Sequence, residues 1–221
     1  MLASFLDSTN LKPDSSAKDI INLCEQAARY SMAAVCVNPY RLPLARTVLA
    51  GSPVKVCTVI GFPLGADAAL VKRQQAEWAL ENGAAELDMV INLGALKDRQ
   101  IEVLNEELTQ IMGLKQHWPF VLKAIVETGL LSPGELLELL QLLEAQGVDF
   151  IKTSTGINSR GASLEDILTI RRHRRSIKIK ASGGIKTLAW AQQLISAGVD
   201  RIGSSNAVSL VLEEMAGNGC S

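Results

Sequence analysis

Two lysines lie where apolar, β-branched runs give way to small residues in the second half of the chain. Lys152 lies in the segment 150–156 (FIKTSTG), and Lys180 lies in the segment 177–184 (IKIKASGG). This pattern predicts that each lysine projects from the end of a buried strand into a pocket. Burial disfavours the charged ammonium form, and a second ammonium nearby does so too. Because a neutral lysine is a nucleophile towards carbonyl carbons, the pair predicts a Schiff-base site.

A single lysine at a strand end has a simpler interpretation, in which it caps the strand and extends its ammonium group into solvent. Here there are two, and glycine follows each of them within four residues. The pair therefore favours the functional interpretation, with one lysine as the nucleophile and the other as its activator.

Composition and charge exclude several classes of protein. The 221 residues are 48% hydrophobic and 20% charged, which suits one large globular domain. The net charge of −1 creates no field that would attract nucleic acid or an anionic membrane. No apolar run is long enough to span a membrane, and the N-terminus lacks the pattern of a signal peptide. We therefore expect a cytoplasmic protein that binds neither nucleic acid nor membrane.

The cysteines and histidines do not form a recognisable ligand pattern. The four cysteines are scattered, without a CxxC motif, and are expected to be reduced thiols. His117 and His173 are the only histidines and are far apart in sequence, which argues against a His-rich metal site or a Ser-His-Asp triad. The basic run 171–175 ends a predicted helix, where positive charge is favourable without any ligand.

Short apolar runs alternate with longer helical patterns along the whole chain. The predicted strands span residues 4–7, 33–37, 54–60, 86–91, 120–127, 149–153, 177–181 and 200–203. The predicted helices span residues 15–30, 40–50, 67–82, 98–117, 133–146, 163–174, 187–197 and 207–215. Eight such units predict an α/β protein with one domain over residues 1–221, a (β/α)8 barrel of the TIM type. A doubly wound open sheet is the rival fold, and the absence of a dinucleotide-binding fingerprint disfavours it.

Local motifs support these boundaries. Ser132-Pro133-Gly134-Glu135 has the form of a capping box with proline at the first helical position. Gly83, Gly147 and Gly198 each follow a predicted helix and precede a predicted strand, as expected of C-terminal caps.

In a barrel of this kind, polar residues at the carboxyl ends of the strands form the active site. Such residues are Asp7, Asp88, Lys123, Glu127, Lys152, Thr155 and Lys180. Asp88 interrupts an apolar run, and a buried carboxylate needs a cationic partner. Two interpretations overlap: Asp88 forms a structural ion pair inside the barrel, or it couples to Lys152 and Lys180 and moves protons.

Two glycine- and serine-containing turns are suited to an anion. The segments 182–185 (SGGI) and 203–206 (GSSN) follow the seventh and eighth predicted strands, which are the usual phosphate loops of such barrels. Glycine allows close approach of the backbone, and free N–H groups at a helix start favour phosphate. Together the two turns predict a phosphate site.

These motifs, in this order, resemble the deoxyribose-phosphate aldolases, which are class I aldolases with a (β/α)8 fold. The resemblance runs nearly end to end through segments 7–13 (DSTNLKP), 35–39 (VCVNP), 59–65 (VIGFPLG), 87–92 (LDMVIN), 126–131 (VETGLL), 152–156 (KTSTG), 180–184 (KASGG) and 201–205 (RIGSS). It implies reversible cleavage of 2-deoxy-D-ribose 5-phosphate to D-glyceraldehyde 3-phosphate and acetaldehyde, in deoxynucleoside breakdown.

The resemblance also implies roles for single residues. Lys152 forms the Schiff base, Lys180 keeps Lys152 neutral, and Asp88 takes part in proton transfer. The residues implied to hold the phosphate are Gly156, Gly183, Gly184, Ser204 and Ser205, and those implied to line the sugar end are Thr155 and Asp7. An iminium on lysine is itself the electron sink of the reaction, so no metal and no organic cofactor is expected.

The chain departs from the family pattern at three places. Ser8 stands where many members have histidine, and Ile157 stands where some have a phosphate-binding lysine. The C-terminal segment 217–221 (GNGCS) lacks the tyrosine of some members, so water or Asp88 would have to serve in proton transfer.

Two other functions stay open from sequence: a different Schiff-base enzyme, such as another phosphosugar aldolase or a pyridoxal-phosphate protein, and a non-catalytic phosphosugar-binding barrel. Simple binding does not need a buried lysine pair, which argues against the second. The expected partners are small phosphosugar and aldehyde substrates, together with a second copy of the chain in a homodimer.

Overall fold

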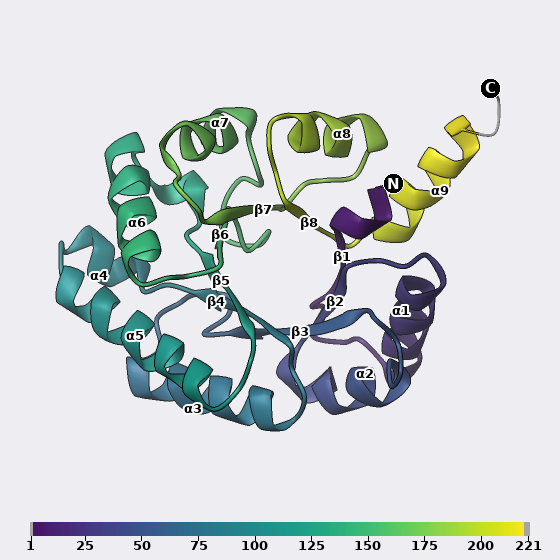
Figure 1. Ribbon diagram of the computed structural model, residues 1–221, viewed down its shortest axis with the longest axis horizontal. Helices are drawn as coiled ribbons and strands as arrows, with labels where there is room; N and C mark the ends of the chain where they lie inside the picture. Colours follow the sequence, from purple (N-terminus) through teal and green to yellow (C-terminus); the bar gives the residue numbers. More distant parts are fainter. Residues whose placement is uncertain (1, 219–221) are drawn as a thin grey trace.

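Eight parallel strands close into a barrel with helices around it in the computed structural model, which describes residues 2–218 (Figure 1). The strands pair in chain order, and β8 pairs with β1 to complete the closure. The strands are β1 (Leu6–Asn10), β2 (Ala34–Val37), β3 (Lys55–Ile60), β4 (Glu86–Val90), β5 (Val121–Ile125), β6 (Phe150–Lys152), β7 (Lys178–Ser182) and β8 (Arg201–Ser204). The expected (β/α)8 fold is confirmed, and the open-sheet alternative is excluded.

Helices connect successive strands on the outside of this barrel (Figure 1). The α-helices are α1 (Ala17–Arg29), α2 (Leu42–Val48), α3 (Ala69–Glu81), α4 (Leu93–Lys97), α5 (Ile101–Gly113), α6 (Pro133–Ala145), α7 (Leu164–His173), α8 (Leu188–Ser196) and α9 (Ala207–Asn218). The 3-10 helices are η1 (Leu2–Phe5), η2 (Pro39–Arg41), η3 (Leu114–Gln116) and η4 (Thr128–Leu130). None of the helices within residues 2–218 is both long and apolar enough to cross a membrane.

The predicted helix caps are confirmed. The Ser132 side chain accepts a hydrogen bond from the backbone N–H of Glu135, and the Glu135 carboxylate accepts one from the N–H of Ser132. Gly83, Gly147 and Gly198 all have positive φ, which a side chain would oppose. Each of these glycines ends one helix and turns the chain into the next strand.

Several predicted boundaries were wrong, because short 3-10 turns and left-handed residues interrupt the periodic pattern. The first strand begins at Leu6 rather than Ser4, since residues 2–5 form η1. The helix predicted over 98–117 begins at Ile101, because Arg99 has a φ of +58°. The short helix α4 was not predicted; the Asn92 side chain caps it by accepting a hydrogen bond from the N–H of Ala95.

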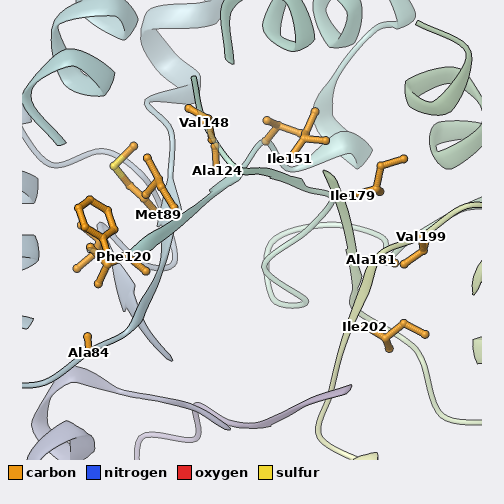
Figure 2. Packing of buried hydrophobic residues seen from close by; sticks show 14 of the residues in the cluster. Ala84, Met89, Phe120, Ala124, Val148, Ile151, Ile179, Ala181, Val199 and Ile202 are labelled. Carbon is orange, nitrogen blue, oxygen red and sulfur yellow. The ribbon is translucent and has the colours of Figure 1, made fainter. Parts of the chain in front are cut away.

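The apolar core lies between the outer face of the barrel and the helices. Figure 2 shows Met89, Ile151, Ile179 and Ile202 projecting from the strands away from the barrel axis. Because side chains alternate along a strand, the neighbours of these residues point inwards. Several of those inward positions carry charged side chains, among them Asp88, Lys152 and Lys180, whereas most barrels of this type fill them with valine, isoleucine and leucine.

The basic run 171–175 contributes to the packing of the outer layer. Arg171 donates a hydrogen bond to the carbonyl of Ala197, at the C-terminal end of α8. Arg174 pairs with Asp200 at 2.5 Å, just before β8. At least two of the five side chains therefore tie α7 to the α8–β8 connection.

Candidate active site

The alternation of side chains along the strands brings seven ionisable groups together inside the barrel. They are Asp7 on β1, Glu86 and Asp88 on β4, Lys123 on β5, Lys152 on β6, Lys180 on β7 and Arg201 on β8. Register pairs Asp88 with Lys123 and Lys152 with Lys180 across neighbouring strands. Strand pairing therefore joins groups that are up to 194 residues apart in sequence.

Asp88 is the centre of this cluster. Its Oδ2 accepts hydrogen bonds from the Nζ atoms of Lys152 and Lys180, both at 2.7 Å. Its Oδ1 accepts from Lys123 Nζ at 2.9 Å and from the Cys57 thiol at 3.1 Å. Burial alone would raise the pKa of the Asp88 carboxyl, but the ammonium groups of Lys123, Lys152 and Lys180 hold it well below its usual range. The low pKa favours the ionised carboxylate, and a lysine nitrogen contacts each of its oxygens.

Asp7 holds the second lysine from the opposite side. Its Oδ2 lies 2.5 Å from Lys180 Nζ, and its Oδ1 lies 2.6 Å from Arg201. Burial would lower the pKa of Lys180, but the carboxylates of Asp7 and Asp88 raise it. Lys180 is therefore a charged ammonium between two carboxylates.

Glu86 and Lys123 complete the cluster beneath these residues. Lys123 Nζ lies 2.5 Å from a Glu86 oxygen, and Arg201 lies 3.4 Å from the other oxygen. The cluster then contains four cationic side chains and three carboxylates. One positive charge is in excess when every group is ionised.

A pocket of about 780 Å³ opens at the carboxyl ends of the strands, beside this cluster. Lys152 lines it, whereas Lys180, Asp88 and Asp7 are buried behind it. The predicted binding residues that line the pocket are Thr155, Gly156, Gly183, Gly184, Ser204 and Ser205. The structure brings Asp7 to Lys180 rather than to the pocket wall.

The two predicted phosphate turns form one end of this pocket. The Ser204 hydroxyl donates to the carbonyl of Ile185 at 2.7 Å and accepts from the N–H of Asn206 at 3.0 Å, so it joins the two turns. Ser205 is exposed to the pocket. Lys186 also lines this end, directly after the glycine turn, and sequence analysis did not single it out.

Sequence analysis also missed Glu86, Arg201 and the Cys57 thiol. Glu86 lies two residues before Asp88, so strand periodicity places both carboxylates on the inner face. Arg201 lies at the start of β8 and resembles a solvent-exposed strand end in sequence. Only closure of the barrel places it next to Asp7.

One group of side chains within residues 2–218 has the atom types of a metal site. Cys36, Cys57 and Asp88 place their ligand atoms within 4.8 Å of one another. Lys123 Nζ lies 3.5 Å from the Cys57 sulfur, and ammonium groups contact both oxygens of Asp88. These positive charges oppose a bound cation.

The chain is similar throughout its length to known aldolases. A family model described as DeoC/LacD family aldolase matches residues 3–210. Deoxyribose-phosphate aldolases from Treponema denticola and Thermococcus kodakarensis are each 44% identical, over 95% of this chain and over 98% and 95% of the relatives' own lengths. Among solved structures, an aldolase called QR15 is 40% identical, with a TM-score of 0.93 over 98% of this chain and 97% of that one. A deoxyribose phosphate aldolase from Aeropyrum pernix, described as tetrameric, is 32% identical, with a TM-score of 0.90 over 97% and 91%.

The fold is a (β/α)8 barrel in which a lysine lines the pocket at the carboxyl ends of the strands. The comparisons identify the family of this barrel. The chain belongs to the DeoC/LacD family of aldolases and is therefore a carbon–carbon lyase. The fold, the family and the enzyme class expected from the sequence are confirmed.

The buried carboxylates predict how stability depends on pH. The folded-state pKa values of Asp7 and Asp88 lie below the usual value of 3.8. Their contribution to stability is thus complete above that pH and is lost as pH falls towards the folded-state values, because the unfolded chain binds protons first. Two such groups give a slope that approaches about 2.7 kcal/mol per pH unit once the pH is about one unit below ~3.8, where the unfolded carboxyl groups are mostly protonated. Urea unfolding between pH 5 and 3 measures it, and Asp7→Asn should reduce the slope; a flat profile would contradict the prediction.

Proposed function

We propose that this aldolase reversibly cleaves 2-deoxy-D-ribose 5-phosphate to D-glyceraldehyde 3-phosphate and acetaldehyde through a Schiff base on Lys152. The observation that carries the proposal is the position of Lys152, which lines the pocket while its Nζ contacts a carboxylate shared with a second lysine. The names of the relatives from Treponema denticola and Thermococcus kodakarensis support the choice of substrate.

Among the three lysines of the cluster, Lys152 has the fewest carboxylate contacts. Lys180 and Lys123 each contact at least two carboxylates, whereas Lys152 contacts only that of Asp88 among residues 2–218. Removing the one excess positive charge of the cluster breaks the fewest ion pairs at Lys152, which also lies next to the pocket. The neutral amine that results has the lone pair needed to attack a carbonyl.

The reaction then follows from the chemistry of an imine. The Lys152 amine adds to the C1 aldehyde of the open-chain sugar, and loss of water leaves an iminium. Deprotonation of the C3 hydroxyl breaks the C2–C3 bond, releases D-glyceraldehyde 3-phosphate and leaves an enamine. Protonation of the enamine at C2 and hydrolysis of the imine release acetaldehyde and restore the amine.

Asp88 and Lys180 are proposed to donate and accept the protons that these steps require. The shared Oδ2 lies 2.7 Å from each lysine nitrogen, so a proton moves between the two through one carboxylate oxygen. The charge of Lys180 opposes protonation of Lys152. Asp7 is proposed to act on the sugar end through Lys180, since its carboxylate holds that ammonium in place.

The phosphate is proposed to bind at the end of the pocket formed by the turns after β7 and β8. Gly183 and Gly184 both have positive φ, and turns with such residues can form the backbone N–H nests that bind anions. Ser205 adds an exposed hydroxyl, and Gly156 and Thr155 form the facing wall. Lys186 supplies a positive charge at this end, where Ile157 offers none.

Reduction with borohydride is expected to trap the substrate on Lys152. After incubation with acetaldehyde, peptide mapping should find an ethyl group on the Lys152 nitrogen, and Lys152→Ala should abolish both trapping and turnover while the protein still folds. Lys180→Met should still be labelled on Lys152, but only at higher pH, because the neighbouring charge is gone. An adduct on Lys180 or Lys123 in the wild-type protein would overturn the assignment of the nucleophile.

Ser205 is expected to bind the phosphate and nothing else of the substrate. Its loss removes one charge-assisted hydrogen bond, worth on the order of 1.5–3 kcal/mol, so Ser205→Ala should raise KM for deoxyribose 5-phosphate about 10- to 100-fold. Kinetics with unphosphorylated deoxyribose should not change. Ser209→Ala, at an exposed position of α9 away from the pocket, is the matched control. Equal losses on the two sugars would show that Ser205 supports the fold instead.

We also propose that the enzyme works in deoxynucleoside breakdown in the cytoplasm. We propose further that it is a homodimer. Leu70 and Trp78 lie two helical turns apart on α3 and are 58% and 41% exposed. An exposed apolar stripe of this kind suits an interface between copies of the chain. The tetrameric description of the Aeropyrum pernix relative supports self-association within the family.

Sedimentation equilibrium is expected to give twice the mass of the chain. Trp78→Glu places a charge in the proposed interface, so it should shift the protein towards monomer. Glu81→Gln, on an exposed position of the same helix, is the control. A wild-type monomer at micromolar concentration would refute the dimer.

A further inference from the structure

Glu127 is a fully buried carboxylate that belongs to neither the charged cluster nor the pocket wall. It lies just after β5, with φ of +51° and ψ of +61°. The left-handed region is unfavourable for a residue with a side chain, so the surrounding contacts must hold this conformation. These contacts show how Glu127 acts on the neighbouring loop.

The Glu127 carboxylate binds the loop that connects β6 to α7. Its Oε2 accepts hydrogen bonds from the hydroxyl of Thr155 at 2.5 Å and from the Thr155 N–H at 3.1 Å. Its Oε1 accepts from the Ser159 hydroxyl at 2.6 Å. The Thr155 hydroxyl in turn accepts from the N–H groups of Ile157 and Asn158. One carboxylate therefore sets the path of the loop from residue 155 to residue 159.

The same loop packs against the glycine turn after β7. The N–H of Ala162 donates to the carbonyls of Ser182 and Gly183. A Cβ on Gly161 would lie 2.1 Å from the Gly183 carbonyl oxygen, so the two backbones are in direct contact. A Cβ on Gly156 would also meet Gly183, at 3.5 Å. A shift of the β6–α7 loop is thus passed to the turn that is proposed to bind phosphate.

We propose that Glu127 is a positioning residue that sets the geometry of the phosphate end of the pocket, through the β6–α7 loop and Gly183. This role rests on the proposed function, because it assumes a phosphorylated substrate. It does not involve the reacting carbon, since the Lys152 nitrogen is held by Asp88, whereas the Glu127 carboxylate bonds to Thr155 and Ser159. Glu127 therefore affects how the phosphate is bound rather than how the carbon–carbon bond is broken.

The test is Glu127→Gln, which keeps the size of the side chain but replaces one acceptor oxygen with a donor. KM for deoxyribose 5-phosphate should rise about tenfold, as expected when a charge-assisted hydrogen bond is lost, while kcat changes little. Kinetics with unphosphorylated deoxyribose and trapping of acetaldehyde by borohydride should match the wild type. Equal changes for both sugars, or no change for either, would overturn the proposal.

Two controls separate positioning from general stability. Glu144 accepts backbone hydrogen bonds from Arg175, Ser176 and Ile177 at the opposite end of the barrel, so Glu144→Gln removes a comparable anchor away from the pocket. It should lower the melting temperature without the selective rise in KM. Ser159→Ala removes one donor to Glu127 and should give a smaller rise, which keeps the test available where Glu127→Gln folds poorly.

A binding measurement distinguishes failure of this inference from failure of the proposed function. Calorimetric titration with inorganic phosphate needs no turnover, and Glu127→Gln should weaken phosphate binding about tenfold. A wild-type protein that binds phosphate but does not trap acetaldehyde would refute the Schiff-base proposal alone. Phosphate affinity that is unchanged in Glu127→Gln would refute the role of Glu127 alone.

Discussion

The constraint on which the site depends is the cost of burying charge inside a closed barrel. Asp88 is removed from solvent, and an isolated carboxylate there would be neutralised by a proton. Lysines on three successive strands supply ammonium partners instead. In turn, a carboxylate partner offsets the cost of burying each lysine. The strands must therefore keep their register, because a slip by one residue would turn every one of these side chains into the apolar outer layer.

The two faces of the strands have different roles in this barrel. The outer faces of the strands pack against the helices and provide the apolar burial that stabilises the fold, as Figure 2 shows for Met89 and Ile202. The interior of the barrel is therefore free to hold charged groups in fixed positions. Lys123, Glu86 and Arg201 form a lower level that neutralises and orients the two aspartates above it. Lys152 is left at the pocket with one carboxylate partner, which is the physical basis of the proposed nucleophile.

The pocket itself is built from loops that depend on one another. Gly183 contacts the loop after β6, and Ser204 donates a hydrogen bond to the turn after β7, so this end of the pocket is assembled from three connections rather than from one motif. Glu127 anchors the first of them from within the protein. Loops that are already ordered by such contacts would bind the proposed phosphate at a lower entropic cost.

Periodicity and local motifs were enough to predict the eight strands and the helix caps, because each of these depends on neighbours close in sequence. The barrel and the lysine pair were predicted from the number and order of these units. The family resemblance added the roles of single residues. Closure of the barrel decided the rest: that Arg201 meets Asp7, that Asp7 holds Lys180 instead of lining the pocket, and that Asp88 is shared by three lysines. The helix boundary near Arg99 also escaped prediction, because this residue ends α4 in a left-handed conformation that is uncommon for a residue with a side chain. Glu127 has the same conformation, and there hydrogen bonds to Thr155 and Ser159 hold it.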